Sequence, residues 1–283
     1  MLSHGSNPLA LPLADGTVRV YFSCRDDRSR SHVGFVELDP RRPAEILRIA
    51  EKPALAPGPL GYFDDHGTYA MSLVEHEGRL LLYYVGWNPG PRPFYYPSIG
   101  LAVSDDGGES FERFSKAPIM ARSDVDPWMV SSPFVMLDEG RWRMWYLSGI
   151  GWREEEDGLH SYYHTKYAES DDGVSWAREG RVALELREGE RNIARMSIVR
   201  DEDRYRAWYP YNRGEGYRIG YAESDDGYAW TRRDDEAGIG PSESGWDSEA
   251  TAYPWVFDHG GTRYMLYSGN GLGHAGFGLA EAT

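Results

Sequence analysis

Short segments of alternating hydrophobic and polar residues recur along the chain. They are "RLLLYYVG" at residues 79–86, "RWRMWYLSG" at 141–149, "RYRAWYPYN" at 204–212 and "TRYMLYSGN" at 262–270, with "VRVYFSCR" at 18–25 as a fifth. Such alternation is typical of β-strands. Aligned on their second aromatic residue, the segments are separated by 62, 62, 63 and 58 residues, with the anchors Phe22, Tyr84, Tyr146, Tyr209 and Tyr267. A period of this size indicates repeated structural modules.

Each period contains four predicted strands. In the third period the turn "DEG" joins "SSPFVML" to "RWRMWYLSG", and "DDG" joins "YHTKYAES" to "VSWARE", which predicts two hairpins. Five such units without helical periodicity predict an all-β fold: a five-bladed β-propeller of four-stranded antiparallel blades in a single domain. The predicted blades cover approximately residues 1–57, 58–119, 120–185, 186–240 and 241–283.

One turn sequence occurs in three of the units, as "SDDGVSW" at residues 170–176, "SDDGYAW" at 224–230 and "SDDGGESF" at 104–111. Its carboxylate can bond backbone amides and its glycine can adopt positive φ, so we interpret it as a structural turn between the third and fourth strands. The last unit ends after its third strand. We therefore expect either a last blade that lacks its closing strand or a natural start upstream of Met1.

Composition and charge narrow the classes of function. The 283 residues are 41% hydrophobic and carry a net charge of −15, which we interpret as favouring solubility. Without a basic block, a nucleic-acid partner is not expected. No stretch is long and apolar enough for a membrane span. The single cysteine, Cys24, and the lack of a secretion signal after Met1 predict a cytoplasmic protein.

The predicted loops differ in length between the two faces of the propeller. Turns between strands one and two, and between strands three and four, are short and share one face. The opposite face collects long, polar and aromatic loops, at residues 25–32, 86–97, 149–164, 211–218 and 268–274. Because loops on a rigid scaffold carry function, the site is predicted on this second face.

Counting back from the anchors predicts which residues surround the central funnel. Eighteen positions before them lie His4, His66, Trp128, Arg191 and Glu249, and two positions further back lie Asp64, Asp126 and Asp247. Glycosidic cleavage needs one carboxylic acid and one carboxylate that activates water or attacks. We predict Glu249 as the acid, Asp64 or Asp65 as the base or nucleophile, and Asp126 as a residue that orients substrate or tunes the acid. Aspartate is also ordinary turn chemistry, so structural roles stay open for the three aspartates.

Aromatic and polar residues near these acids are candidates for substrate binding. Tryptophans can stack on a sugar ring, and Arg195 can hold a substrate hydroxyl or carboxylate, pair with an acid, or only neutralise charge. The candidates are His4, His66, Trp87, Asn88, Trp128, Trp152, His164, Arg195, Arg218, Arg25 and Asp26. No cofactor is expected; a divalent metal at His4 and His66 is an alternative that no His-x-His spacing supports.

The motifs "WYLSG", "YAESDDG" and "GWDSE" resemble those of the five-bladed β-propeller glycoside hydrolases, the superfamily of families 32, 43, 62, 68 and 130. The resemblance covers the whole chain and is strongest for an uncharacterised bacterial, glycosidase-like branch. It implies an inner-strand Asp, a second Asp and a Glu as base, modulator and acid, which Asp64 or Asp65, Asp126 and Glu249 can supply. The acids of family 43 lie on blades one, three and four, whereas these lie on blades two, three and five.

The sequence thus predicts a glycosidase that cleaves a glycosidic bond with an Asp/Glu pair in the central funnel, and its partner is a carbohydrate or glycoconjugate. Two alternatives stay open. One is a carbohydrate-binding propeller without catalysis, since a fold does not fix a function. The other is a phosphorolytic or metal-dependent enzyme acting on glycosyl bonds.

Overall fold

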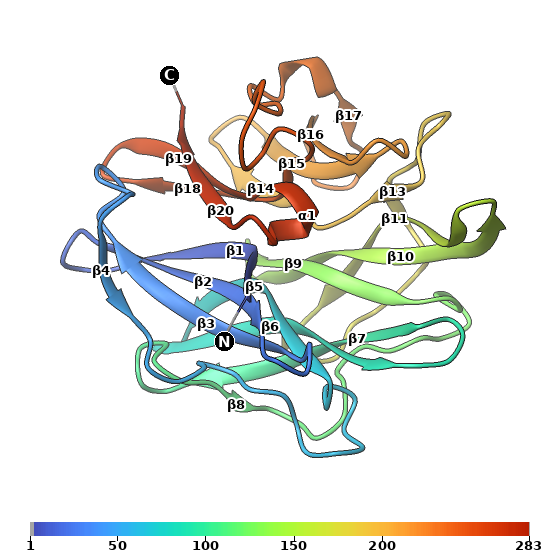
Figure 1. Cartoon of the computed structure of the whole chain (residues 1–283), viewed down its shortest axis with the longest axis horizontal. Coiled ribbons are helices and arrows are strands. Elements are labelled where there is room, and N and C mark those ends of the chain that lie inside the picture. Colours follow the sequence, from blue (N-terminus) through green and yellow to red (C-terminus); the bar gives the residue numbers. More distant parts are fainter. Residues whose placement is uncertain (1–2, 283) are drawn as a thin grey trace.

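The computed structural model describes residues 3–282. Nearly all regular structure in this range is β-strand; the exceptions are the 3-10 helix η1 (Asp234–Glu236) and the short helix α1 (Asn270–Gly273). The strands form five antiparallel groups that follow one another around a ring in chain order, as the colours of Figure 1 show. The predicted all-β propeller is therefore confirmed. No helix in residues 3–282 has the length and hydrophobicity that crossing a membrane requires.

The first four groups have four strands each. The first group contains β1 (Ser3–Pro12), β2 (Val18–Arg25), β3 (Ser31–Leu38) and β4 (Ile46–Ile49). The second contains β5 (Gly67–His76), β6 (Arg79–Pro89), β7 (Tyr95–Ser104) and β8 (Glu112–Arg113). The third contains β9 (Val130–Asp138), β10 (Arg141–Glu155), β11 (Gly158–Ser170) and β12 (Val182–Leu184).

The fourth group contains β14 (Ser197–Arg200), β15 (Tyr205–Asn212), β16 (Tyr217–Ser224) and β17 (Thr231–Arg232). The short strand β13 (Asn192–Ile193) pairs with both β11 and β15, and so joins the third group to the fourth. The fifth group contains β18 (Ala252–His259), β19 (Thr262–Ser268) and β20 (Phe277–Glu281). Within the described residues this last sheet has three strands.

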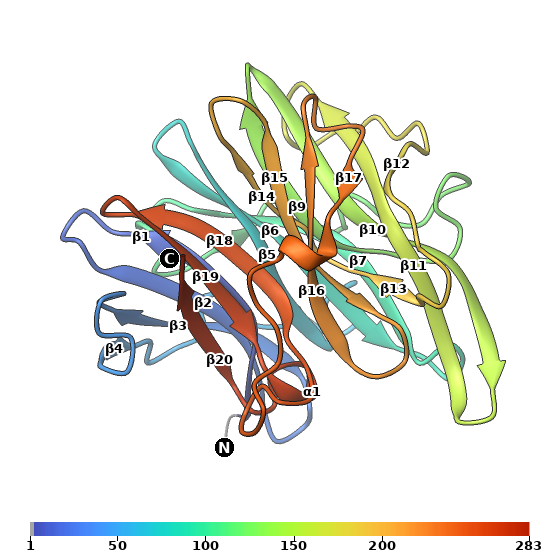
Figure 2. The ribbon, with the colours of Figure 1, turned by 90° about the horizontal axis from the view of Figure 1, so that it is seen from above.

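The first and last groups close the ring. Strand β1 contacts β18, β19 and β20, and Figure 2 shows the blue N-terminal strands beside the red C-terminal strands. Hydrogen bonds also join them. The Ser6 hydroxyl donates to the carbonyl of Leu272 at 2.6 Å, the backbone N–H of Asn7 donates to the Ser268 hydroxyl at 3.2 Å, and His259 of β18 donates to the carbonyl of Gly16 at 3.0 Å. Closure thus uses contacts between side chains and backbone, together with packing between the two groups.

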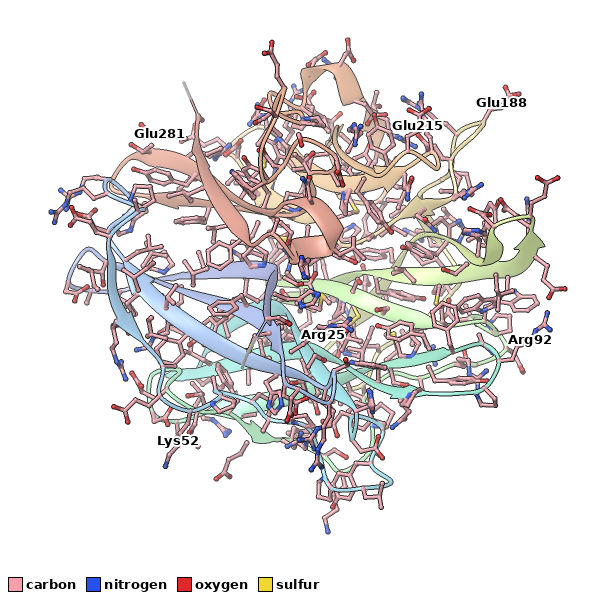
Figure 3. The ribbon with its side chains drawn as sticks, in the orientation of Figure 1. Arg25, Lys52, Arg92, Glu188, Glu215 and Glu281 are labelled. Atoms are coloured by element: carbon pink, nitrogen blue, oxygen red, sulfur yellow. The ribbon has the colours of Figure 1, made fainter. Side chains whose placement is uncertain are left out.

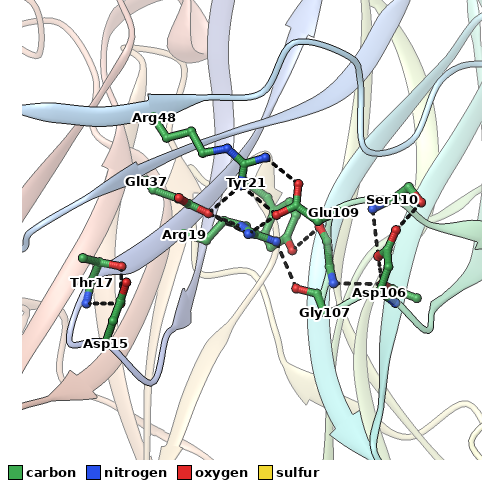
Figure 4. Close-up of polar contacts among 12 residues, drawn as sticks. Asp15, Thr17, Arg19, Tyr21, Glu37, Arg48, Asp106, Gly107, Glu109 and Ser110 are labelled. Atoms are coloured by element: carbon green, nitrogen blue, oxygen red, sulfur yellow. Dashed lines mark hydrogen bonds and ion pairs between the residues drawn. The ribbon is translucent and has the colours of Figure 1, made fainter.

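Charged residues lie mostly on the outside of the ring. Figure 3 labels Lys52, Arg92, Glu188, Glu215 and Glu281 at the periphery and Arg25 near the middle. Figure 4 shows one outer network, in which Arg19 of β2 donates to Glu37 of β3 at 2.9 Å and to the carbonyl of Gly107 in the second group at 2.9 Å. Such pairs link neighbouring groups.

The repeated turn connects strands as predicted. In the turn that follows β11, the Ser170 hydroxyl accepts a hydrogen bond from the N–H of Gly173 at 2.9 Å, and Asp172 accepts from the N–H of Ser175 at 2.7 Å. The carbonyl of Gly173 then accepts from the Tyr83 hydroxyl of the preceding group at 2.9 Å. The corresponding turns repeat this contact, from Tyr21 to Gly108 and from Trp145 to Gly227. The turn therefore both closes a hairpin and ties adjacent groups together.

We expect these turns to make folding stability fall in acid. Hydrogen bonds from backbone amides lower the pKa of Asp172 to about 2, below its unfolded value near 3.8. A depressed carboxyl pKa contributes stability above the unfolded pKa and loses it as pH falls from about 4 to about 2. Asp172→Asn keeps an acceptor but does not titrate, so it should flatten this part of the stability–pH curve, measured by urea denaturation. Asp225→Asn, at an exposed aspartate of the equivalent turn in the next group, is the control, and an unchanged slope in Asp172→Asn would contradict the assignment.

Candidate functional site

A cavity of about 390 Å³ opens at one end of the propeller axis. Its walls come from the starts of the first strands β1, β5, β9 and β18, from the ends of second strands and starts of third strands, and from α1. This is the face predicted from the long loops. The fourth group supplies no residue of the lining within residues 3–282. We call this cavity the central pocket; its volume lies within the range of small-molecule sites.

Irregular backbone shapes the pocket. Of the eight non-glycine residues in the described chain that have positive φ, five line it: His4, Asn7, Ser132, Tyr253 and Leu272. Register shifts interrupt the pairing of β1, β5, β9 and β18 close to these positions. Bulges re-aim side chains, and strained backbone often accompanies function. The inner strands therefore depart from regular pairing where they meet the pocket.

Four tyrosines form much of the wall: Tyr69, Tyr95, Tyr163 and Tyr253. Burial raises the pKa of Tyr95, Tyr163 and Tyr253 above the usual value, so these phenols are neutral at physiological pH. The Tyr163 hydroxyl hydrogen-bonds to that of Tyr217 in the fourth group. Their hydroxyls can donate and accept hydrogen bonds, and their rings can pack against an apolar face.

Serine and asparagine side chains add further neutral polar groups. The pocket serines are Ser6, Ser131, Ser132 and Ser161. Asn7 is 5% exposed, and its side-chain oxygen has no hydrogen-bond partner among the described residues. Because buried polar atoms are normally paired, this amide is available for a ligand. Met71, Phe94, Met129 and Leu147 complete the lining with apolar surface.

Besides the tyrosines, the ionisable residues of the lining are Arg25 and His4. Arg25 donates to the Tyr69 hydroxyl at 3.1 Å, and no carboxylate among residues 3–282 pairs with it. His4 packs edge-to-face against His274, with ring centroids 5.0 Å apart. Burial first, and then the charges of Arg25 and His274, lower the pKa of His4, so this imidazole is neutral at pH 7. Both residues were predicted to contact substrate, and both line the pocket.

No aspartate or glutamate of the described chain lines the central pocket. The predicted catalytic residues are therefore not where a two-carboxylate mechanism requires them. Asp64 and Asp126 are fully buried elsewhere. Asp64 accepts from the Tyr84 hydroxyl at 2.9 Å and pairs with Arg113 at 2.7 Å. The structure therefore does not bring Asp64 and Asp126 into the lining of the central pocket.

Asp126 shows the same arrangement in the third group. It accepts from the Tyr146 hydroxyl at 3.1 Å and pairs with Lys166 and Arg178, each at 3.1 Å. In the fifth group Asp247 accepts from Tyr267 at 2.9 Å. An aspartate twenty residues before the anchor tyrosine is thus a repeated structural contact, which holds the loop before the first strand against the sheet.

The other two predicted acids, Asp65 and Glu249, also lie outside the pocket lining. Asp65 accepts from the N–H of Gly61 at 2.8 Å and from the side-chain amide of Asn88 at 2.6 Å. Glu249 has an exposed side chain, and Arg218 donates to its backbone carbonyl at 2.8 Å. Asn88 and Arg218, both predicted to bind substrate, therefore stabilise loops.

Arg195 is also corrected. It is fully buried on the axis and donates to four backbone carbonyls, those of Pro8, Met71, Tyr253 and Pro254, at 2.9–3.3 Å. Burial lowers the pKa of Arg195 to about 9, which leaves it charged at neutral pH. Because Met71 and Tyr253 line the pocket, this cation lies beneath the pocket floor. It is thus bonded to the backbone of the inner strands and does not line the pocket.

The remaining predicted binding residues lie around or behind the pocket. Trp87 is buried and packs against Tyr69 and Tyr95, and His66 packs on Trp87. Trp152 packs edge-to-face on Phe94, a lining residue, with centroids 5.9 Å apart. These four aromatic contacts support the wall from outside.

Three further candidates lie in contacts of their own. Trp128 is 48% exposed. His164 pairs with Glu185 at 3.1 Å. Asp26 pairs with Arg30 at 2.9 Å and His32 at 3.1 Å. None of the three lines the central pocket.

The alternative metal site at His4 and His66 is not assembled. Within the described part of the chain, the one set of three potential ligands that converge is Glu155, Asp157 and His160. These residues lie on the β10–β11 hairpin, away from the pocket lining.

Comparisons with known proteins identify two relatives from Mycobacterium tuberculosis. The uncharacterized proteins MT1551, of strain CDC 1551, and Rv1502, of strain H37Rv, are each 41% identical to this chain over 279 residues. These residues cover 98% of this chain and 92% of each relative. No protein-family model matches the chain.

Solved structures with a similar fold include glycoside hydrolases. A thermostable family-43 glycoside hydrolase has a TM-score of 0.72 at 13% identity, covering 99% of this chain and 90% of that protein. A complex of BT0996 with RGII has a TM-score of 0.75 at 18% identity, covering 99% of this chain and 87% of the other. The fold is that of the five-bladed β-propeller glycoside hydrolases, as the sequence motifs implied.

Proposed function

We propose that this chain, which belongs to the family of the Mycobacterium tuberculosis proteins MT1551 and Rv1502, binds a carbohydrate in its central pocket. The observation that carries the proposal is the chemistry of the lining. Four tyrosines, four serines and an unpaired buried amide surround a cavity of about 390 Å³. Hydroxyl and amide groups match the hydroxyls of a sugar, and aromatic rings match its C–H faces.

Binding without cleavage fits this pocket better than hydrolysis by a carboxylate pair. Glycosidic cleavage in most families needs two carboxyl groups about 5–10 Å apart on either side of the scissile bond. No carboxylate from residues 3–282 lines the pocket, and Asp64 and Asp126 are neutralised by Arg113, Lys166 and Arg178. Of the alternatives that the sequence left open, the carbohydrate-binding propeller is therefore our first candidate.

Glycoside hydrolysis is the second candidate, because solved structures with this fold are glycoside hydrolases. The acids available to it are Asp65 and Glu249, which lie outside the pocket lining. The RGII partner in one of those structures is a feature of that protein. It supports a saccharide as ligand class here without naming the sugar.

A saccharide screen tests the proposal. We expect at least one oligosaccharide to bind, measured by titration calorimetry, without release of reducing ends. Ser161→Trp, which fills the pocket from β11, should weaken that binding at least about tenfold, a loss of about 1.4 kcal/mol. Ser242→Trp, at an exposed serine, is the matched control.

Two results would decide against binding alone. Turnover that is lost in folded Glu249→Gln or Asp64→Asn/Asp65→Asn would establish the hydrolase. Binding that Ser161→Trp leaves unchanged would remove the central pocket as the site.

A further inference from the structure

The central pocket carries an unbalanced positive charge. Most arginines of the chain pair with a carboxylate, as Arg19, Arg113 and Arg232 do. Arg25 does not, although the chain has 45 acidic residues against 30 basic ones. Its contact within the described residues is the neutral hydroxyl of Tyr69 at 3.1 Å. Arg25 is therefore a half-buried cation at the pocket with no carboxylate partner in the described chain, and it is free to hold an anion from outside.

Two imidazoles lie beside this guanidinium. His4 and Arg25 both line the pocket, and Ser3, the neighbour of His4, pairs with Arg25 across β1 and β2. The ring of His274 packs on that of His4, with centroids 5.0 Å apart. An anion bound next to Arg25 would favour protonation of the His4 imidazole. The mouth of the pocket can therefore add positive charge when an anion enters.

A further cation acts from below. Arg195 is fully buried under the floor, and its partners are backbone carbonyls rather than carboxylates. In a water-poor interior its charge is poorly screened, so it raises the potential of the pocket above it.

The nearest carboxylate in sequence does not neutralise Arg25. Asp26 points to its own loop, where it accepts from Arg30 and His32. Although burial opposes this, hydrogen bonds from His32 and Arg30 lower the pKa of Asp26, so it is ionised and already paired. The pocket therefore has cations at its mouth and beneath its floor, and none of its described lining residues is an acid.

We propose that the saccharide bound in the central pocket carries an anionic group, a carboxylate or a phosphate, held by Arg25 beside His4 and His274. This inference rests on the proposed carbohydrate-binding function and names its ligand class. Arg25 presents two parallel N–H groups that match either anion, while the tyrosine and serine hydroxyls bind the sugar ring. The ligand of this pocket is thus a saccharide that contains a uronate, or a sugar phosphate.

Paired ligands test the charge separately from the sugar. One pair is a glucuronate-containing oligosaccharide and the same oligosaccharide after reduction of its carboxylates to alcohols. The other is glucose 6-phosphate and glucose, with inorganic phosphate alone as a further probe. We expect one acidic member to bind at least about tenfold tighter than its neutral partner, and its identity distinguishes uronate from phosphate. The difference should shrink in about 1 M salt.

Variants assign the charge to one side chain. Arg25→Gln should remove the preference for the acidic ligand, about a ten- to hundredfold loss, while Arg25→Lys keeps part of it. Arg28→Gln makes the same charge change on an exposed arginine of the same loop and should leave affinity unchanged. Thermal melting checks that each variant is folded.

The outcomes separate the two proposals. Equal affinity for acidic and neutral members overturns the anionic ligand and leaves carbohydrate binding intact. An equal loss in Arg25→Gln and Arg28→Gln also overturns it, because the effect would then be one of overall charge. If neither saccharide pair nor any neutral oligosaccharide binds, the proposed function itself fails.

Discussion

Replacing Arg195 by methionine is expected to destabilise the protein by about 3–5 kcal/mol, a large share of a typical folding free energy. The Arg195 guanidinium holds four carbonyls, from β1, β5 and β18, at the axis of the ring. Methionine fills a similar volume but donates no hydrogen bond. The carbonyls would then face one another unpaired in a site that water does not reach.

The stability lost with the four hydrogen bonds is expected to exceed the stability gained by removing a buried charge. A buried guanidinium without a counter-ion is itself costly, and methionine would relieve that cost. However, each buried acceptor left unpaired costs about 1–3 kcal/mol, and there are four of them. Urea denaturation followed by tryptophan fluorescence measures the balance. Arg200→Met, at an exposed arginine at the end of β14, is the control and should change stability by less than about 0.5 kcal/mol.

A stable Arg195→Met protein would show that the ring does not depend on this contact. The ligand affinity of that variant would then report on the pocket, because Met71 and Tyr253 contribute both carbonyls bonded by Arg195 and part of the lining. If Arg195 stabilises the ring but does not shape the pocket through Met71 and Tyr253, the folded fraction of Arg195→Met should bind ligand as the wild type does.

The strands and their grouping could be predicted because the evidence for them is local. Alternation within eight residues identifies a strand, and the 62-residue period identifies the unit, whatever the rest of the chain does. The turn at Ser170 and its equivalents followed from the same local chemistry.

The sequence predicted the face on which the pocket lies but not most of the residues that line it. Loop lengths predicted the face that carries the pocket, counting from the anchors gave the lining residue His4, and the long loop at residues 25–32 gave Arg25. It could not give the direction of a side chain at the start of a strand. Bulges with positive φ at Asn7, Ser132 and Tyr253 turn these residues toward the pocket. Because non-glycine residues rarely adopt positive φ, these bulges could not be predicted from the sequence.

A repeated pattern in the sequence already favoured a structural role for three of the aspartates. Asp64, Asp126 and Asp247 each precede an anchor tyrosine by twenty residues. A residue that recurs at one position in several units more often maintains the unit than performs chemistry, which needs different groups around one ligand. The tyrosine contacts at 2.9–3.1 Å bear this out.

Replacing Asp126 by alanine is accordingly expected to cost about 3–5 kcal/mol of stability, whatever it does to ligand binding. Its carboxylate receives hydrogen bonds from Tyr146, Ser148, Lys166 and Arg178 and has no exposed surface. Alanine would strand two cations and two hydroxyls around a void. Asp126→Asn keeps an acceptor of similar shape but removes the charge, so its cost should be smaller but still measurable.

The opposite pattern would restore a catalytic role for Asp126. Acids held ready for chemistry often destabilise a fold, so their amides are as stable as the wild type or more stable. We expect instead that the urea midpoint falls in the order wild type, Asp126→Asn, Asp126→Ala, while Asp124→Ala, an exposed neighbour, matches the wild type. An Asp126→Asn protein with undiminished stability that had lost a glycoside-cleaving activity of the wild type would overturn the structural assignment, because a carboxylate that holds Lys166 and Arg178 in place cannot be neutralised at no cost.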